Sequence, residues 1–297
     1  MLHVHNFSYG LLTPVLAYAM SCLGAFLGLR CTSRARAYAG AARARWLLLA
    51  AVSIGATGVW VMHFIAMLGY TIPGQTILYN VPITILSMLI AVAVVGVGLF
   101  IVGFGRDGWP NLLLAGTIAG IGVASMHYTG MAAMQMQGQM TYELQLLVLS
   151  VVIAIVAATA ALWAALRLHG IWSTLGAALI MGVAVSGMHY TGMAAMRMGP
   201  VQAGAGMLMT GATAQSFLLP LIIGISLLSF ALTATIALSP DHDEIRAEED
   251  LMARLGLAAE VPGFGPPSGP PGPRHRDQPG RSGPQACRGR GTPAGRG

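Results

Sequence analysis

Seven long apolar runs constrain the fold of this chain more than any other feature of its sequence. None of them carries a charged residue in its central part. The hydrocarbon core of a bilayer is about 30 Å thick and takes about 20 apolar helical residues to cross. Backbone groups in lipid must also satisfy their own hydrogen bonds, which favours helices. We therefore predict an all-α membrane protein with seven transmembrane helices, at residues 9–29, 46–69, 81–104, 109–134, 143–166, 172–196 and 215–238.

The composition supports the membrane class and excludes one function of seven-helix proteins. Hydrophobic residues make up 55% of the chain and charged residues only 9%, whereas soluble domains carry about 25% charged residues. The sequence contains no Lys. A retinal Schiff base requires a Lys amine, so the chain is not a rhodopsin.

The arginines predict how the helices are oriented in the membrane. Positively charged loops stay in the cytoplasm, and the first, third and fifth loops hold most of the arginines outside the C-terminal tail. We therefore expect an extracellular N-terminus, a cytoplasmic C-terminus and a multi-pass protein of the bacterial plasma membrane. The arginines in question are Arg30, Arg34, Arg36, Arg43, Arg45, Arg106 and Arg167.

A sharp change of composition after the last apolar run divides the chain into three parts. We expect a membrane domain at 1–240, a short amphipathic cytoplasmic segment at 241–260 and a disordered tail rich in Pro, Gly and Arg at 261–297. The two C-terminal parts are too plain for a kinase, a cyclase or a DNA-binding domain. We therefore expect neither enzyme activity nor a nucleic-acid partner.

One short sequence motif, here called the word, occurs three times along the chain. The copies are "WVMHFIAMLGY" at 60–70, "SMHYTGMAAMQM" at 125–136 and "SGMHYTGMAAMRM" at 186–198. Each copy ends an even-numbered helix, and the interval between copies is that of one helical hairpin. The spacing predicts three tandem two-helix repeats followed by a seventh helix, with all three words at the outer ends of their helices.

The repeated word pairs histidine with methionine at helical spacing. In each copy a Met follows the His by four residues, so the two side chains stack on one helix face, about 6 Å apart along the axis. The pairs are His63 with Met67, His127 with Met131 and His189 with Met193. In the second and third copies the stripe continues to Met134 and Met196, whereas Tyr70 stands there in the first. Thioether and imidazole ligands together favour copper.

A purely structural role for these residues is the alternative to a metal site. A lone Met in an apolar helix is usually a core residue that fills gaps, and a lone His is often only a hydrogen-bond partner between helices. The in-phase recurrence of the pair favours a metal or ligand role. Gly130 and Gly192 suggest close helix approach, and His3 and His5 lie near the same outer layer.

The three words resemble the signature of the MHYT domain, a bacterial integral membrane sensor, and the resemblance extends over roughly residues 9–240. It implies a seven-helix domain that holds copper near its outer face and senses oxygen, carbon monoxide, nitric oxide or redox state. Tyr128 and Tyr190 would assist. The best-known members carry fused output domains, so a separate cytoplasmic or membrane partner would read this chain. The implied copper ligands are Met62, His63, Met67, Met126, His127, Met131, Met188, His189 and Met193.

Four functional hypotheses remain open on the sequence alone. The first is a copper-containing sensor of a gas or of redox state. The second is a copper-handling or transport protein, although no methionine ladder crosses the membrane. The third is a haem-binding membrane protein, since His/Met ligation is a known haem pairing. The fourth is a purely structural membrane protein.

Overall fold

The computed structural model describes residues 8–72, 76–136, 140–168, 170–199 and 211–238, together with Leu251, and of 233–238 it describes only the backbone. The chain divides into two units, 1–240 and 241–297, and the long helices of the described residues belong to the first. The amphipathic segment and the tail expected after residue 240 lie, apart from Leu251, outside the described residues. His3 and His5 also lie outside them.

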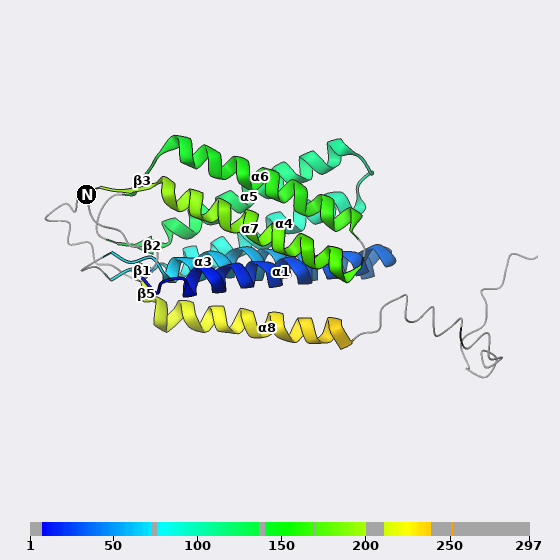
Figure 1. Ribbon diagram of the computed structural model, residues 1–297, viewed down its shortest axis with the longest axis horizontal. Coiled ribbons are helices and arrows are strands. Elements are labelled where there is room, and N and C mark those ends of the chain that lie inside the picture. The colour runs from blue at the N-terminus through cyan, green and yellow to red at the C-terminus, as the bar shows by residue number, and fades with distance from the viewer. Residues whose placement is uncertain are drawn as a thin grey trace, which may run out of the picture. The chain divides into compact units, whose positions relative to one another are not determined.

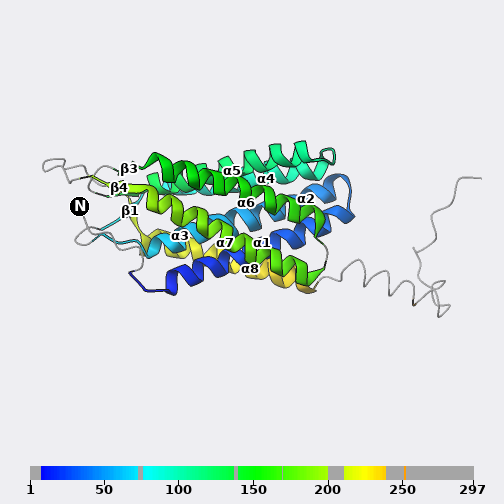
Figure 2. The same cartoon turned by 45° about the horizontal axis from the view of Figure 1, so that its top comes forward.

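Long helices running side by side build the first unit (Figures 1 and 2). Within the described residues, seven are long and apolar enough to cross a membrane, which confirms the predicted fold class. The second of these helices consists of three consecutive segments, and the seventh helix consists of two. In order they are α1 (Leu12–Ala37); α2 (Gly40–Val52), η1 (Ser53–Val61) and α3 (Met62–Leu68); α4 (Val81–Phe104); α5 (Trp109–Ala132); α6 (Leu144–Arg167); α7 (Ile171–Ala195); η2 (Ala214–Leu218) and α8 (Leu219–Leu238).

The second helix is the most enclosed of the seven, with 78% of its most apolar window buried. It packs against α1, α4 and α8, while α5, α6 and α7 follow one another and α7 returns to α1. Its middle segment, η1, is π-helical, which the sequence analysis did not predict. A Cβ added to Gly24 of α1 would lie 2.2 Å from the backbone nitrogen of Gly58 in η1. The expectation that small residues permit close helix contact is thus confirmed here.

The basic segment between the first two helices is helical, and the predicted loop at 30–45 is wrong. The first helix continues to Ala37, and the second begins at Gly40, where φ is +57°. Arginine and alanine are both good helix formers, and long arginine side chains lie along apolar surface. The Arg34 guanidinium carbon lies 5.3 Å from the centre of the Trp46 ring.

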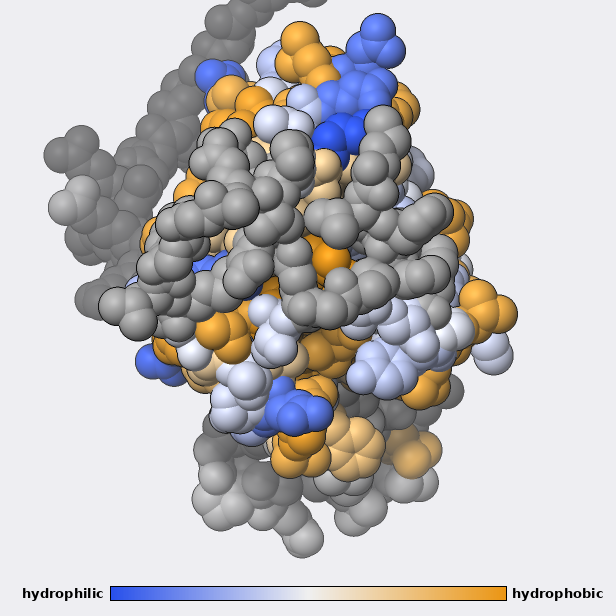
Figure 3. All heavy atoms as spheres, turned by 90° about the vertical axis from the view of Figure 1, so that its left-hand side faces the viewer, coloured by the Kyte–Doolittle hydropathy of each residue, from blue (hydrophilic) through white to orange (hydrophobic). Residues whose placement is uncertain are grey.

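Among the described residues, five short strands that were not predicted lie at the end opposite the basic segment (Figure 1). They form two small antiparallel sheets, one ordered β2-β1-β5 and the other pairing β3 with β4. Figure 3 looks onto this end, where both apolar (orange) and polar (blue to white) residues reach the surface. The strands are β1 (Leu78–Tyr79), β2 (Met134–Gln135), β3 (Met140–Tyr142), β4 (Met196–Met198) and β5 (Ala212–Thr213).

These strands correct one detail of the predicted methionine stripe. Helix α5 ends at Ala132 and α7 at Ala195, so Met134 and Met196 belong to strands. Both side chains are buried. The helical His/Met spacing therefore holds only as far as Met131 and Met193.

Candidate metal centre

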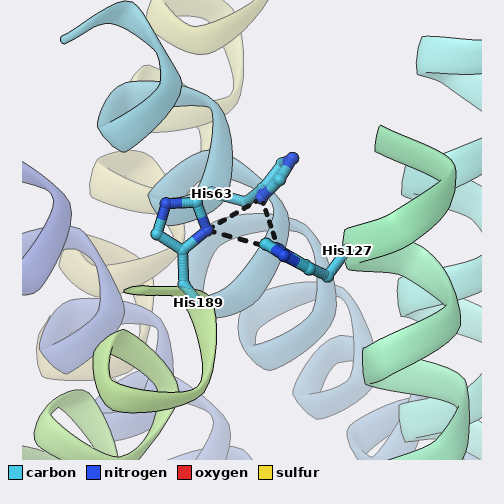
Figure 4. Close-up of side chains that lie close together, drawn as sticks. All are labelled: His63, His127 and His189. Carbon is cyan, nitrogen blue, oxygen red and sulfur yellow. Dashed lines mark hydrogen bonds between the residues drawn. The ribbon is translucent and has the colours of Figure 1, made fainter. Parts of the chain in front are cut away.

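The three histidines of the repeated word meet in one cluster (Figure 4). His63 comes from α3, His127 from α5 and His189 from α7. Their Nδ1 atoms form a triangle with sides of 3.0, 3.1 and 3.3 Å. Each pair of rings is nearly perpendicular, with interplanar angles of 81°, 83° and 87°. We call these three residues the histidine triad.

The triad lies in the interior of the helix bundle. His63 and His189 are each 1% exposed, and His127 is 0% exposed. The three helix ends that carry the words lie at one end of the unit, which places the three imidazoles at the same level. The equal depth expected from the repeat is therefore observed.

Hydrogen bonds cannot account for all three sides of the Nδ1 triangle. An imidazole Nδ1 either donates through its proton or accepts through its lone pair. With three atoms and two roles, at least two neighbours must have the same role and cannot bond to each other. A single cation that accepts a lone pair from each ring would satisfy all three.

The spacing of the Nδ1 atoms fits one metal ion. In a tetrahedral site, metal–imidazole bonds of about 2.0–2.1 Å place the nitrogens about 3.3–3.4 Å apart, and the observed sides of 3.0, 3.1 and 3.3 Å are close to that spacing. His63, His127 and His189 form a group of potential ligands within 4.8 Å of one another. Three imidazoles from one protein would leave a fourth position for a further ligand, an arrangement found in catalytic zinc sites. The triad can therefore bind a metal, and its ligands alone do not identify which one.

Two glycines of the repeated word leave room for the histidine rings. A Cβ on Gly130 would lie 2.6 Å from Nε2 of His63, and one on Gly192 would lie 2.3 Å from Nε2 of His127. Both Nε2 atoms are buried, without a hydrogen-bond partner among the described residues. Each ring therefore lies against the glycine of the following copy. We expected these glycines to allow close contact between helices, and here they allow close contact with an imidazole ring. In the first copy Ala66 stands at the corresponding position.

All six methionines predicted as ligands are buried, with exposed fractions of 7% or less. Met67 borders an outer groove of about 580 Å³ between α1, α3 and α8. Met188 borders a separate cavity inside the bundle. As ligands, the methionines remain a prediction. The six are Met62, Met67, Met126, Met131, Met188 and Met193.

The tyrosine after the second histidine has a packing role. The Tyr128 hydroxyl lies 2.7 Å from Oγ of Ser150, and its ring centre lies 5.3 Å from that of Tyr142. Phe64, at the same position of the first copy, packs against Tyr79 with ring centres 6.1 Å apart. Tyr128 is thus engaged with α6 and β3. Tyr190 is half-buried.

Strands and backbone hydrogen bonds form a cap over the motif ends, which was not predicted from the sequence. The backbone N–H of Asn80 donates to the carbonyl of Ala133 over 2.8 Å, and that of Glu143 donates to the carbonyl of Ala195 over 2.8 Å. Each bond ties the start of one helix to the end of the next word-bearing helix. The sequence held one signal for this cap, a second periodicity. Tyr79 and Tyr142, which directly precede Asn80 and Glu143, each follow the histidine of the preceding copy at a similar distance.

Comparison with known proteins identifies the family. The profile of the MHYT family, described as "Bacterial signalling protein N terminal repeat", matches residues 57–115, 120–178 and 182–246. Each match begins in a word-bearing helix, so the family repeat has the period of our two-helix units but starts at a different point. No solved structure matches the chain.

The curated relatives are larger signalling proteins. The chain is 38% identical over 193 residues to the bifunctional diguanylate cyclase/cyclic di-GMP phosphodiesterase MucR of Pseudomonas aeruginosa, covering 63% of this chain and 28% of the relative. It is 38% identical over 199 residues to the cyclic di-GMP phosphodiesterase NbdA of the same species, covering 65% and 25%. Against the signaling protein YkoW of Bacillus subtilis it is 29% identical over 189 residues, covering 61% and 23%. The chain spans about a quarter of the length of these relatives. It belongs to the MHYT family, as a multi-pass membrane domain of the kind found in bacterial signalling proteins.

Proposed function

We propose that this chain is a membrane sensor that holds one copper ion at the histidine triad and responds to a diatomic gas or to redox state. The observation that carries the proposal is the convergence of three buried Nδ1 atoms within 3.3 Å of one another. His63, His127 and His189 would bind the ion, and the buried methionines of the three words would supply soft sulfur ligands. A bound copper ion would supply a position for a small ligand and a one-electron redox couple.

The same geometry argues against a haem held between two histidines of the triad. Two axial ligands of a haem lie on opposite faces of the macrocycle, whereas the triad nitrogens are in mutual contact. Copper handling remains the second candidate. Its support is Met67, a soft sulfur residue that borders the outer groove.

The orientation and the output are also part of the proposal. The described arginines of the first, third and fifth connections lie at the end of the bundle opposite the triad. The triad would then lie toward the outer face of the plasma membrane. We propose that the chain is itself not an enzyme and that a separate signalling partner reads the change at the triad. MucR and NbdA bear the names of cyclic di-GMP enzymes, which makes a protein of cyclic di-GMP signalling the first partner to test.

Metal analysis of the purified protein tests the proposal. We expect one copper ion per chain after reconstitution, with loss of copper in His127→Ala and in His189→Ala. His169→Ala, which changes a histidine outside the triad, should retain the metal. A chain that takes up no copper, or that retains it in both triad variants, would refute the proposed centre.

A further inference from the structure

An apolar space between the helices is set apart from the triad nitrogens. Its volume is about 60 Å³, and it is lined by residues of the second helix, α4, α5, α6 and α7. All fifteen lining residues are Ala, Val, Leu, Ile or Met. We call it the inner cavity.

The sequence of α6 explains why the inner cavity exists. Five alanines of this helix line it, at positions 154, 157, 158, 161 and 165. These spacings of three, four and seven residues put the alanines on one helix face. Leu162 is the one larger α6 side chain in the lining, so most of this helix face presents only methyl groups and leaves a gap wherever the neighbouring helices do not close in.

The chemistry of the lining decides what can occupy this space. A buried water typically makes about three hydrogen bonds, and a cavity lined only by apolar side chains offers none, so such cavities stay dry and take up apolar ligands. One water-sized probe needs about 10–15 Å³ of such space. The inner cavity therefore has room for a molecule of a few heavy atoms, uncharged and without strong hydrogen-bonding groups.

The inner cavity also reaches the level of the triad. Met181, Val185 and Met188 of α7 line it, and Met188 directly precedes His189. From Met181 to Met188 the helix rises about 10 Å. An occupant at the Met188 end would press on the residue next to a triad histidine.

We propose that the inner cavity is a binding site for a small apolar molecule, separate from the histidine triad, and that its occupancy shifts His189 through Met188. Binding depends on the cavity alone, whereas any signalling consequence rests on the proposed function. The two can fail separately, because the cavity is testable in protein without metal.

Xenon is the probe, measured by xenon NMR on the metal-free protein in detergent micelles. Ala158→Leu and Ala161→Leu each fill the inner cavity from α6. Ala160→Leu is the matched control, because Ala160 is exposed on the same helix and does not line the cavity. Helical circular dichroism checks that each variant is folded.

We expect saturable xenon binding in the wild type and in Ala160→Leu, reduced at least fivefold in both filling variants. The imidazole NMR signal of His189 should shift with xenon in the wild type and stay unchanged in Ala158→Leu. Absence of saturable binding in the wild type, or equal binding in the filling variants, would overturn the site. Bound xenon with an unmoved His189 signal would overturn the coupling.

Discussion

Single glycines determine how closely the triad can assemble. The rings of His63 and His127 lie where a side chain on Gly130 or Gly192 would have to be. Small residues in membrane helices are usually explained by contact between helix backbones. Here the contact is with an imidazole, so these glycines take part in forming the histidine triad.

Gly192→Ala should displace His127 and weaken metal binding at least tenfold, because the new Cβ would lie 2.3 Å from Nε2. Overpacking of this kind destabilises by about 1–3 kcal/mol. Gly187→Ala is the control on the same helix, since a Cβ there meets nothing within 4 Å. It should be neutral or slightly stabilising, because alanine is the better helix former. Metal titration and thermal unfolding of both variants check this, and equal metal affinity in the two would contradict it.

Tyr70 is a second residue with a measurable signature. Its side chain is 3% exposed, and its hydroxyl has no hydrogen-bond partner among the described residues. Burial, with a smaller contribution from Tyr142, raises the pKa of Tyr70 to about 12. An unfolded phenol ionises near pH 10. The folded state therefore binds one proton more than the unfolded state between about pH 10 and 12, and stability falls as pH rises through this range.

Tyr70→Phe should remove the part of the stability loss at alkaline pH that comes from ionisation of the Tyr70 hydroxyl. The measurement is the thermal unfolding midpoint from about pH 9 to about pH 11, and the variant should fall less steeply than the wild type. Tyr9→Phe, at an exposed tyrosine, should follow the wild type. Parallel curves for Tyr70→Phe and the wild type would rule out the raised pKa.

At the scale of elements, arginine joins two helices at the basic end. One guanidinium nitrogen of Arg36 on α1 donates to the carbonyl of Ala165 over 2.9 Å, and another donates to that of Leu168 over 2.8 Å. These carbonyls belong to the last turn of α6 and to the residue that follows it, where helical partners are missing. Arg36 thus holds the ends of α1 and α6 together.

Arg36→Gln should lower stability by about 1–3 kcal/mol, since hydrogen bonds to charged groups contribute about that much. Arg36→Lys should recover only part of it, because a single ammonium cannot reproduce the fork of the guanidinium. Arg45→Gln, at an exposed position, should change little. Unfolding in mixed micelles measures the series, and an Arg36→Gln variant as stable as Arg45→Gln would contradict the capping role.

The sequence predicts long elements well and short ones poorly. Apolar runs identify the seven helices, because lipid leaves few alternatives for a backbone of that length. The repeat also predicts that His63, His127 and His189 share a level. It does not reveal the capping strands, which are two or three residues long and depend on tertiary contacts. Nor does it reveal that the Nδ1 atoms converge, because that depends on ring rotation within a packed interior.

At the scale of the whole molecule, the orientation in the membrane is open to test. Residue Thr141 in β3 and residue Asp107 between α4 and α5 are both exposed, at opposite ends of the unit. In a chain whose own cysteines are replaced, an impermeant maleimide added to intact cells should label Thr141→Cys and spare Asp107→Cys. Both should react after lysis. The reverse pattern would place the triad toward the cytoplasm.

The central claim is that three imidazoles from three repeats bind one metal ion. X-ray absorption of the copper-loaded protein measures it directly, because the outer ring atoms of each bound imidazole add a recognisable scattering contribution. We predict three imidazole ligands in the wild type and a loss of one or more in His127→Ala. A spectrum with sulfur ligands and no imidazole, or one that His127→Ala leaves unchanged, would contradict the account.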